Sequence, residues 1–279
     1  MTRKLLFLAL TLALALSPAH ADNPIATQIG ADNNSADNPF IQPTDPALSG
    51  GGRDQTLQFG DLLIGRNWDD LLIGRLGTDV LVGGGANDVL VGGTEHFNSF
   101  NRDRAFGGPG VDLFMWAPGD GSDLFIGGPG EDAVLFGLIG ELENGEVVFR
   151  VADDQLAGDV YIDPTTGLPL MDVTNSPGFC EVIDESSEYG ADEELEALGL
   201  DDLVRFSLRD VRDSFEAGEQ SEDNGLRVTL HLKDVEVLVC ASRDGGVIEY
   251  VDLTVSPPQL IDFYQLDPKL QQRLADIVF

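Results

Sequence analysis

Positive charge is scarce in this chain of 279 residues, in which 16 Lys and Arg face 49 Asp and Glu for a formal net charge of -33. Nucleic-acid binding needs a surplus of basic residues that displaces counterions from phosphates, so this class of function is excluded. The acidic excess favours a cationic partner. Apolar residues make up 42% of the chain, more than a wholly disordered acidic protein contains, so a packed core is expected.

Catalytic signatures are also missing. The sequence contains no H-E-x-x-H zinc motif and no G-x-S-x-G nucleophile elbow. Of the two histidines beyond the N-terminal segment, His96 lies in an insertion and His231 on the polar face of an expected strand, and nothing places either beside a nucleophile. A non-catalytic protein is therefore expected.

Long apolar runs occur once, at the N-terminus. Arg3 and Lys4 precede an apolar run from Leu5 to Leu16, and an A-x-A site ends at Ala21. This order predicts that residues 1–21 are a cleaved secretory signal, the alternative being a buried N-terminal helix. We expect a secreted, extracellular protein, with the periplasm or the outer surface as alternatives, and no transmembrane segment.

Cysteine is nearly absent. Cys180 and Cys240 are the two in the chain, and export would carry them to a compartment where thiols oxidise. We expect one disulfide, which would close a loop of about sixty residues and stabilise the fold by roughly 4 kcal/mol through loop-closure entropy. The alternative is that both are small buried apolar residues.

Glycine, in contrast, is abundant and unevenly distributed. Residues 22–55 are rich in Asn, Asp, Pro, Ser and Gly without a sustained period, which predicts a flexible linker. Residues 56–135 carry about half of the glycines and a nine-residue period, and residues 136–279 carry both cysteines and almost no repeat. The pattern predicts a repeat domain over 56–135 and a second domain over 136–279.

The nine-residue blocks share an aspartate at the sixth place. Glycines in the first four places would each cost close to 1 kcal/mol in a helix, so short strands joined by tight turns are expected. The last three places form a strand whose middle residue points inward. The prediction is an all-β-dominated fold, a parallel β-roll or β-solenoid followed by a β-rich region with short helices. The sixth-place residues are Asp61, Asp70, Asp79, Asp88, Asp103, Asp112, Asp123 and Asp132.

Backbone carbonyls of glycine-rich turns and aspartate carboxylates are the oxygen ligands that calcium prefers, and the lack of Cys and His argues against zinc. Two blocks per coil predict two columns, Asp61/Asp79/Asp103/Asp123 and Asp70/Asp88/Asp112/Asp132. Carboxylates stacked about 4.8 Å apart repel one another unless a cation lies between them, so we expect calcium-dependent folding with at most about six ions. The alternative is that each Asp only stabilises its turn.

Four of the blocks, GRLGTDVLV, GGGANDVLV, GGPGVDLFM and GGPGEDAVL, resemble the G-G-x-G-x-D-x-U-x nonapeptide of RTX, or haemolysin-type, calcium-binding repeats. The resemblance implies a right-handed parallel β-roll that binds calcium in its turns outside the cell. Phe59 and Trp68 replace glycine in the first two turns, where we expect weak or absent ions, and an insertion interrupts the turn before Asp103. Besides the aspartates, the implied calcium-binding residues are Gly74, Gly77, Gly83, Gly85, Gly107, Gly110, Gly119, Gly121, Gly127 and Gly130.

The C-terminal region shows weaker patterns. Alternation over 146–151 and 226–233 predicts half-buried strands, and 191–198 reads as a short acidic helix. Asp267 and Pro268 begin an amphipathic helix that we expect to close the open end of a β layer. Apolar residues on both faces of the repeat strands indicate that the C-terminal region covers part of the outer face.

These observations predict a secreted, non-catalytic calcium-binding protein that acts in attachment to a surface or matrix. Two alternatives stay open. One is a polysaccharide-modifying enzyme with its activity in 136–279. The other is an adhesin whose acidic surface crosslinks through calcium or binds cell-surface glycan.

Overall fold

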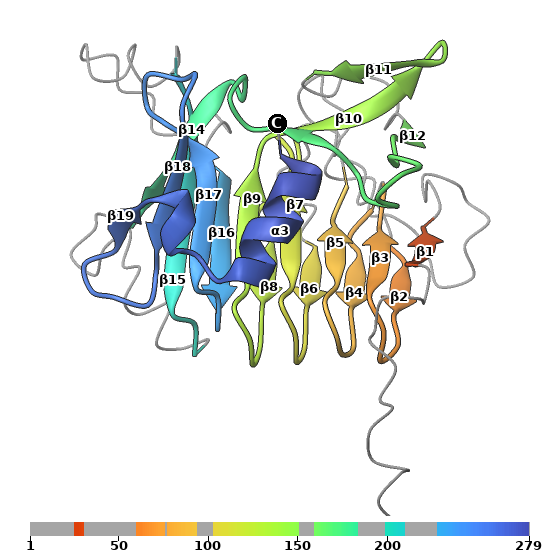
Figure 1. The fold of residues 1–279 in the computed structure, drawn as a ribbon, viewed down its shortest axis with the longest axis horizontal. Helices are drawn as coiled ribbons and strands as arrows, with labels where there is room; N and C mark the ends of the chain where they lie inside the picture. Colours follow the sequence, from red (N-terminus) through yellow and green to blue (C-terminus); the bar gives the residue numbers. More distant parts are fainter. Residues whose placement is uncertain are drawn as a thin grey trace, which may run out of the picture.

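The structure is a computed structural model that describes residues 25–30, 60–75, 77–93, 103–150, 159–183, 199–209 and 228–278. The described part consists mainly of strands in parallel and mixed sheets, which confirms the expected strand-dominated fold. Two sheets share a core, and a smaller sheet projects beyond one end of the strands (Figure 1). The predicted signal segment and the predicted helix over 191–198 lie outside the described residues.

The described strands form three sheets, which follow in their spatial order. The eight-stranded sheet contains β1 (Ala26–Ile29), β3 (Asp70–Ile73), β5 (Val89–Val91), β7 (Leu113–Trp116), β9 (Ala133–Phe136), β17 (Val237–Ala241), β18 (Ile248–Asp252) and β19 (Gln259–Ile261). The seven-stranded sheet contains β14 (Gly178–Val182), β15 (Asp202–Leu208), β16 (Val228–Lys233), β8 (Leu124–Ile126), β6 (Arg104–Phe106), β4 (Val80–Val82) and β2 (Leu62–Ile64). The third sheet contains β11 (Glu146–Phe149), β10 (Leu138–Glu143) and β12 (Asp159–Val160), with β13 (Met171–Asp172) also paired to β10.

Successive repeats contribute strands to the two large sheets in turn. Leu72 of β3 pairs with Leu90 of β5, and Leu63 of β2 pairs with Leu81 of β4, both in parallel and two blocks apart. The middle residue of each strand points between the sheets, as predicted: Leu72 and Leu90 share one buried cluster with Leu81. The nine-residue period therefore places equivalent turns above one another along each edge.

The first strand lies within the segment that the sequence analysis assigned to a linker. β1 pairs in parallel with β3, Ala26 opposite Asp70, and the Gly30 N–H donates to the Ile73 carbonyl at 2.7 Å. The linker interpretation is therefore wrong for residues 26–30. The segment ATQI shows no hydrophobic run that would predict a strand. It is held in the sheet by the pairing of its backbone with β3.

The C-terminal strands continue both large sheets. Val237 of β17 pairs in parallel with Ala133 of β9, and β16 pairs in parallel with β8. Phe206 and Leu232 belong to the same buried cluster as residues of the repeats. The predicted boundary at 135/136 therefore does not separate two cores. The C-terminal strands pair with the last repeat strands, whose edges would otherwise be unpaired.

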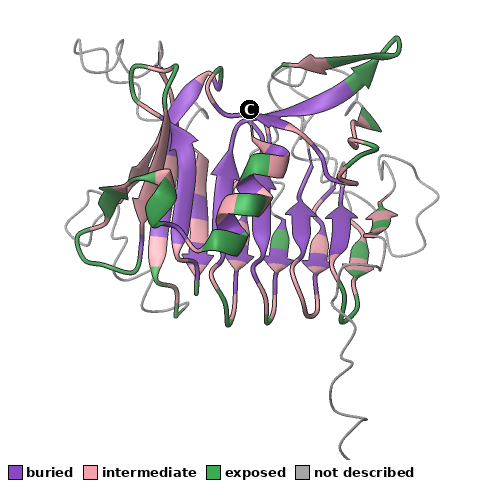
Figure 2. Ribbon diagram, viewed as in Figure 1, coloured by how far each residue is buried: buried purple, intermediate pink, exposed green. Residues whose placement is uncertain are grey.

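The C-terminal helix α3 (Pro268–Ile277) begins where the sequence predicts, with the Asp267 carboxylate accepting from the Lys269 N–H at 2.7 Å. Its buried residues Leu270 and Leu274 pack with Val89 and other residues on the outer face of the eight-stranded sheet. Figures 1 and 2 show α3 across this face, with its exposed side turned outward. Coverage of the outer face is confirmed, whereas closure of an open end was wrong. A short 3₁₀ helix, η3 (Phe263–Gln265), precedes α3.

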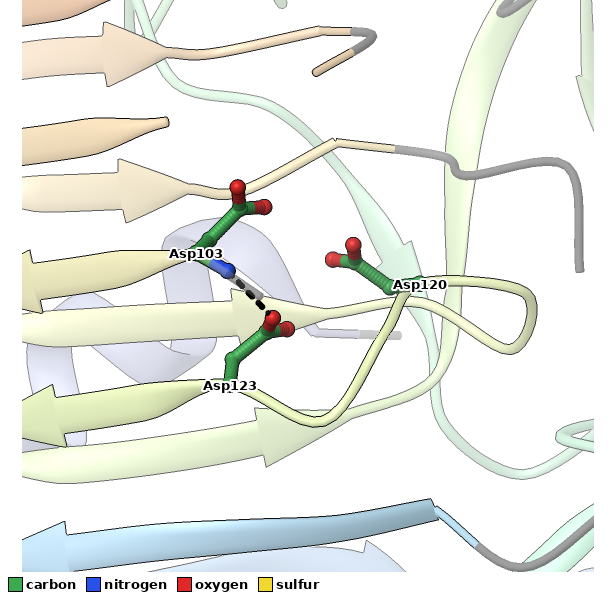
Figure 3. Close-up of side chains that lie close together, drawn as sticks. All are labelled: Asp103, Asp120 and Asp123. Carbon is green, nitrogen blue, oxygen red and sulfur yellow. Dashed lines mark hydrogen bonds between the residues drawn. The ribbon is translucent and has the colours of Figure 1, made fainter. Parts of the chain in front are cut away.

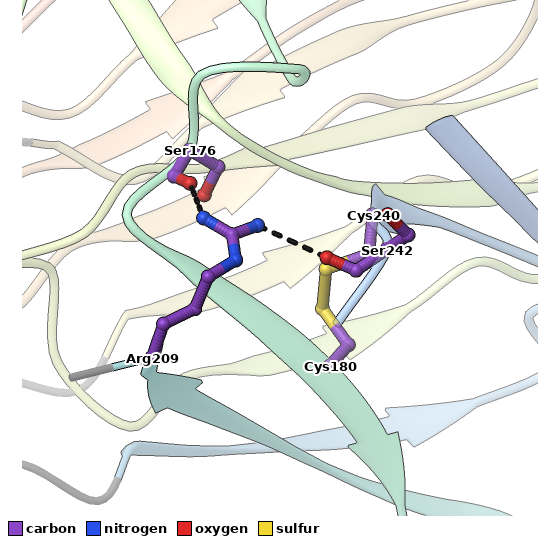
Figure 4. The surroundings of a disulfide bond; sticks show 5 residues. All are labelled: Ser176, Cys180, Arg209, Cys240 and Ser242. Carbon is purple, nitrogen blue, oxygen red and sulfur yellow. Dashed lines mark hydrogen bonds between the residues drawn. A yellow bond between two sulfur atoms is a disulfide. The ribbon is translucent and has the colours of Figure 1, made fainter. Parts of the chain in front are cut away.

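The expected disulfide is confirmed. Cys180 of β14 and Cys240 of β17 are bonded across a sequence separation of 60, and the bond joins the two large sheets. Beside it, the Arg209 guanidinium donates to the carbonyls of Ser176 and Ser242, the latter at 3.1 Å (Figure 4). The disulfide therefore joins the two sheets, and the Arg209 guanidinium bridges two carbonyl oxygens beside it.

Candidate metal centre

The aspartates of the first predicted column stack along one edge. The backbone N–H of Asp61 donates to Asp79 Oδ1 at 2.5 Å, that of Asp79 to Asp103 Oδ1 at 2.6 Å, and that of Asp103 to Asp123 Oδ1 at 2.7 Å. Each carboxylate therefore uses one oxygen to hold the turn before it. The structure brings these four residues together in the predicted order.

The second column repeats this ladder on the other edge. Asp70 donates through its N–H to Asp88 Oδ1 at 2.8 Å, Asp88 to Asp112 at 2.7 Å, and Asp112 to Asp132 at 2.7 Å. In this column the Asp residue and the first glycine of its turn keep a constant spacing, from Gly65 to Asp70 and in every later turn. The second predicted column is also assembled as expected.

In several of the stacked aspartates, the second carboxylate oxygen has no hydrogen-bond donor. The Oδ2 atoms of Asp79, Asp88, Asp112 and Asp132 are buried and accept no hydrogen bond. An unpaired buried carboxylate oxygen is costly, and native proteins normally satisfy such atoms with a hydrogen bond, a water or an ion. These four oxygens are therefore available to a cation or another ligand.

Burial dominates the acid–base behaviour of the same residues. It raises the pKa of Asp79 and Asp112 to about 7 and the pKa of Asp88 and Asp132 to about 8, although backbone N–H donors lower each of them. Neighbouring carboxylates add to the rise at Asp88 and Asp132. A bound cation would reverse this effect, because it favours the charged form of each acid.

In the turns of Asp79, Asp88, Asp112 and Asp132, the first glycine lies against the Oδ2 atom that accepts no hydrogen bond. A Cβ added at Gly83 would lie 2.4 Å from Asp88 Oδ2 and 2.8 Å from the Gly107 carbonyl oxygen. At Gly107 the corresponding distances are 2.4 Å to Asp112 Oδ2 and 2.7 Å to the carbonyl of the next first-place glycine. Gly74 and Gly127 have similar surroundings. Each first-place glycine thus leaves room beside an aspartate oxygen and a carbonyl oxygen of the following coil.

The fourth-place glycines serve the stacking of the coils. A Cβ at Gly110 would lie 1.5 Å from the Ala86 carbonyl oxygen, and one at Gly130 would lie 1.6 Å from the Gly110 carbonyl oxygen. Gly77 occupies the same place with a φ of 140°, which L residues rarely adopt. Gly110 and Gly130 are therefore needed for close approach of successive turns, and Gly77 for its backbone conformation.

The other predicted glycines are placed differently. A Cβ added at Gly85 would lie 3.8 Å from Asn67 Oδ1, its nearest atom, and no aspartate oxygen is among the three atoms nearest to it. Gly119 has a φ of 119°, and the Gly121 carbonyl accepts from the Trp116 indole N–H at 3.1 Å. Gly85 therefore does not lie against an aspartate oxygen in the way that the first-place glycines do, whereas the Gly121 N–H donates to Asp120 Oδ1 at 3.1 Å.

The segment Ala26–Gly30 completes the first turn of the first column. A Cβ at Gly30 would lie 2.8 Å from Asp61 Oδ2 and 2.3 Å from the Gly74 carbonyl oxygen. Gly30 therefore takes the position of a first-place glycine for Asp61, although the two are far apart in the sequence. The sequence analysis missed Gly30 because it searched for this glycine within the contiguous block.

The densest group of carboxylates is Asp103, Asp120 and Asp123. One oxygen from each lies within 4.8 Å of the others, and all three residues are buried (Figure 3). A Cβ at Gly92 would lie 2.4 Å from Asp103 Oδ2 and 3.0 Å from Asp120 Oδ2, and the Gly93 N–H donates to Asp120 at 3.3 Å. The turn that the insertion interrupts therefore holds a group that could bind a metal ion.

Sequence reasoning missed Asp120 because it counted the sixth place of each block alone. The available signal was an acidic residue between Gly119 and Gly121, inside a turn whose carbonyls were already expected to face a cation. Three converging carboxylates offer only oxygen donors and a high negative charge, which suits hard divalent cations such as calcium.

None of the helices in the described ranges is long and apolar enough to cross a membrane.

The comparisons with known proteins add no family to this geometry. No protein-family model, curated protein or solved structure matches the chain.

Proposed function

We propose that this protein is a secreted, non-catalytic calcium-binding protein whose repeats form a β-roll around ions held between stacked turns. The observation that carries the proposal is the set of buried Oδ2 atoms of Asp79, Asp88, Asp112 and Asp132, each without a hydrogen bond and beside a first-place glycine. The group at Asp103, Asp120 and Asp123 supports it with a third carboxylate.

The donor chemistry favours calcium over other metals. Calcium accepts carboxylate and backbone carbonyl oxygens in flexible geometry, whereas magnesium requires a near-octahedral arrangement and retains several waters. Asp88 Oδ2 and the Gly107 carbonyl represent both kinds of ligand at one cradle. Zinc would be expected to recruit His or Cys, and neither occurs in the turns that carry Asp79, Asp88, Asp112 and Asp132.

Mass action gives the ions enough energy to control folding. At a dissociation constant of about 0.1 mM, calcium at about 1 mM contributes roughly 1.4 kcal/mol per site. About six such sites would contribute roughly 8 kcal/mol, which is comparable to the whole free energy of unfolding of a domain. The proposal therefore includes calcium-dependent folding of the repeats.

Circular dichroism of the chain during separate titrations with calcium and with magnesium tests the proposal. We expect a cooperative gain of β signal with calcium and little change with magnesium. Replacing Asp112 and Asp132 together by alanine should weaken the calcium response more than Asp61→Ala, because Asp61 is only partly buried. A chain that is already β-rich in chelator and does not respond to calcium would contradict the proposal.

The extracellular setting rests on two supports. The Cys180–Cys240 disulfide fits an oxidising compartment, and residues 1–21 have the order of a secretory signal. Millimolar calcium outside the cell would occupy the sites, and the acidic surface could then join anionic glycan through shared ions. The measured mass of the exported protein should match a chain without residues 1–21. A chain that keeps these residues and stays inside the cell would contradict secretion.

A further inference from the structure

The turn between β16 and β17, residues Lys233–Glu236, stacks on the last repeat turn as if it were one more repeat. The Gly127 N–H donates to the Lys233 carbonyl at 3.0 Å, and the Gly128 N–H donates to the Asp234 carbonyl at 3.2 Å. In the repeats, a first-place glycine makes the same bond to the last residue of a strand in the next coil, and the residue after it bonds to the glycine that follows that strand. The β16–β17 turn thus has the register of a ninth turn.

Glu236 occupies the position of the next aspartate in the second column. The Asp132 N–H donates to Glu236 Oε2 at 2.7 Å, the same distance that separates the Asp112 N–H from Asp132 Oδ1. Asp234 takes the place of the first-place glycine, because the Gly128 N–H donates to its carbonyl as the Gly108 N–H donates to that of Gly127. The ladder therefore continues beyond the repeats through a residue that is 104 positions away in the sequence.

The space between these two turns has the composition of the repeat cradles. A Cβ at Gly127 would lie 2.2 Å from the Asp234 carbonyl oxygen and 2.6 Å from Asp132 Oδ2. Asp132 has no exposed surface, and its Oδ2 accepts no hydrogen bond. A buried, unpaired carboxylate oxygen thus faces a backbone carbonyl, with a second carboxylate on the adjoining N–H.

We propose a divalent-cation site at this junction, with the Asp132 carboxylate and the Asp234 carbonyl as ligands and the Glu236 carboxylate as the second acidic group. It rests on the proposed calcium binding and extends it beyond the repeats. An ion there ties the β16–β17 turn to the last repeat, where β17 joins β9. The ion therefore links the C-terminal strands to the calcium-dependent part of the fold.

The test compares Glu236→Gln with Glu249→Gln in the full chain. Glutamine keeps an oxygen that can accept from the Asp132 N–H, so the variant removes charge and spares the backbone contact. Glu249 lies on β18 opposite Cys240 of β17, and its replacement makes the same charge change away from the junction. Bound calcium is counted by equilibrium dialysis, and hydrogen exchange reports the Val237 N–H, which donates to the Asp132 carbonyl at 3.0 Å.

We expect Glu236→Gln to bind one ion fewer than the wild type and Glu249→Gln to bind the same number. At calcium about ten times the dissociation constant, where the repeats are folded in every variant, exchange at Val237 should be about tenfold slower in the wild type and in Glu249→Gln than in Glu236→Gln. Asp132→Asn should also lose one ion, and the double variant with Glu236→Gln should lose no more than the single variants, since both residues serve one site.

The outcomes separate the two proposals. A wild-type chain that binds no calcium contradicts the proposed function itself. A wild-type chain that binds calcium, with Glu236→Gln binding the same number of ions and showing the same exchange rate at Val237 in calcium, overturns only the junction site. Loss of all ions in Glu236→Gln also overturns it, because Glu236 would then act on the fold of the whole column and not at a separate site.

Discussion

Without bound divalent cations, the fold should become less stable as the pH rises from about 5 to about 8. Burial raises the pKa of Asp79 and Asp112 from 3.8 to about 7, and the pKa of Asp88 and Asp132 from 3.8 to about 8. The folded chain therefore holds more protons than the unfolded chain between these limits. Its stability is greatest at the acidic end and is lost as the pH passes through the raised pKa values.

The magnitude follows from the same values. Between about pH 5 and about pH 8, an acid with a folded pKa of about 7 loses about 3 kcal/mol of stabilisation, and one with a folded pKa of about 8 loses about 4 kcal/mol. If the four acids titrate independently, their sum is on the order of 14 kcal/mol, within the range of a whole domain's stability. Calcium should restore stability at the alkaline end, where it replaces the lost protons.

Urea denaturation followed by circular dichroism, in chelator and in about 1 mM calcium, measures this dependence. Asp88→Asn should change sign between the two conditions: it should stabilise the cation-free chain at about pH 8 by about 5 kcal/mol and destabilise the calcium-bound chain. Asp244→Asn, in an exposed turn, provides the control and should do neither. A cation-free stability that stays flat or rises with pH, or an Asp88→Asn effect of one sign throughout, would refute the reasoning.

Three further outcomes are expected from the turns and the disulfide. Ala86 has a φ of 80°, so Ala86→Gly should raise the free energy of unfolding in calcium by about 1 kcal/mol in urea melts, and a decrease would contradict the left-handed backbone. Gly110→Ala would place a Cβ 1.5 Å from the Ala86 carbonyl oxygen, so it should abolish the calcium-induced β signal, and a normal titration would show that the turns are spaced further apart. Replacing Cys180 and Cys240 by alanine should lower stability by roughly 4 kcal/mol, and an unchanged melt would remove the bond's stabilising role.

The periodic features of this protein could be predicted from the sequence. The sixth-place aspartates stack in the predicted columns because blocks two apart pair in parallel and in register, as the bonds between Asp70 and Asp88 and between Asp112 and Asp132 show. The inward position of Leu72 follows from the alternation of side chains along a strand. Periodicity therefore specified the backbone register of the repeats.

The features that lie outside the repeat could not be predicted in this way. β1 joins its sheet through backbone bonds, which any residue except proline can make, so its polar sequence gave no signal. Glu236 completes a column from the far side of the C-terminal region, and no local spacing relates it to Asp132. The amphipathic pattern of α3 predicted a helix but not where it packs. Its position depends on which sheet face the strands leave uncovered.

The two edges of the repeats differ in how much chain they accept. Gly30 and Asp61 face each other across one turn, and Gly92 and Asp103 across another, although long stretches of sequence separate each pair. Both detours leave from the same edge, whereas the opposite edge keeps its glycine and aspartate at one spacing from Gly65 to Asp132. One edge thus keeps a constant spacing, and the other accepts insertions. A foreign peptide or binding loop could be grafted at the second edge without changing the spacing of the first.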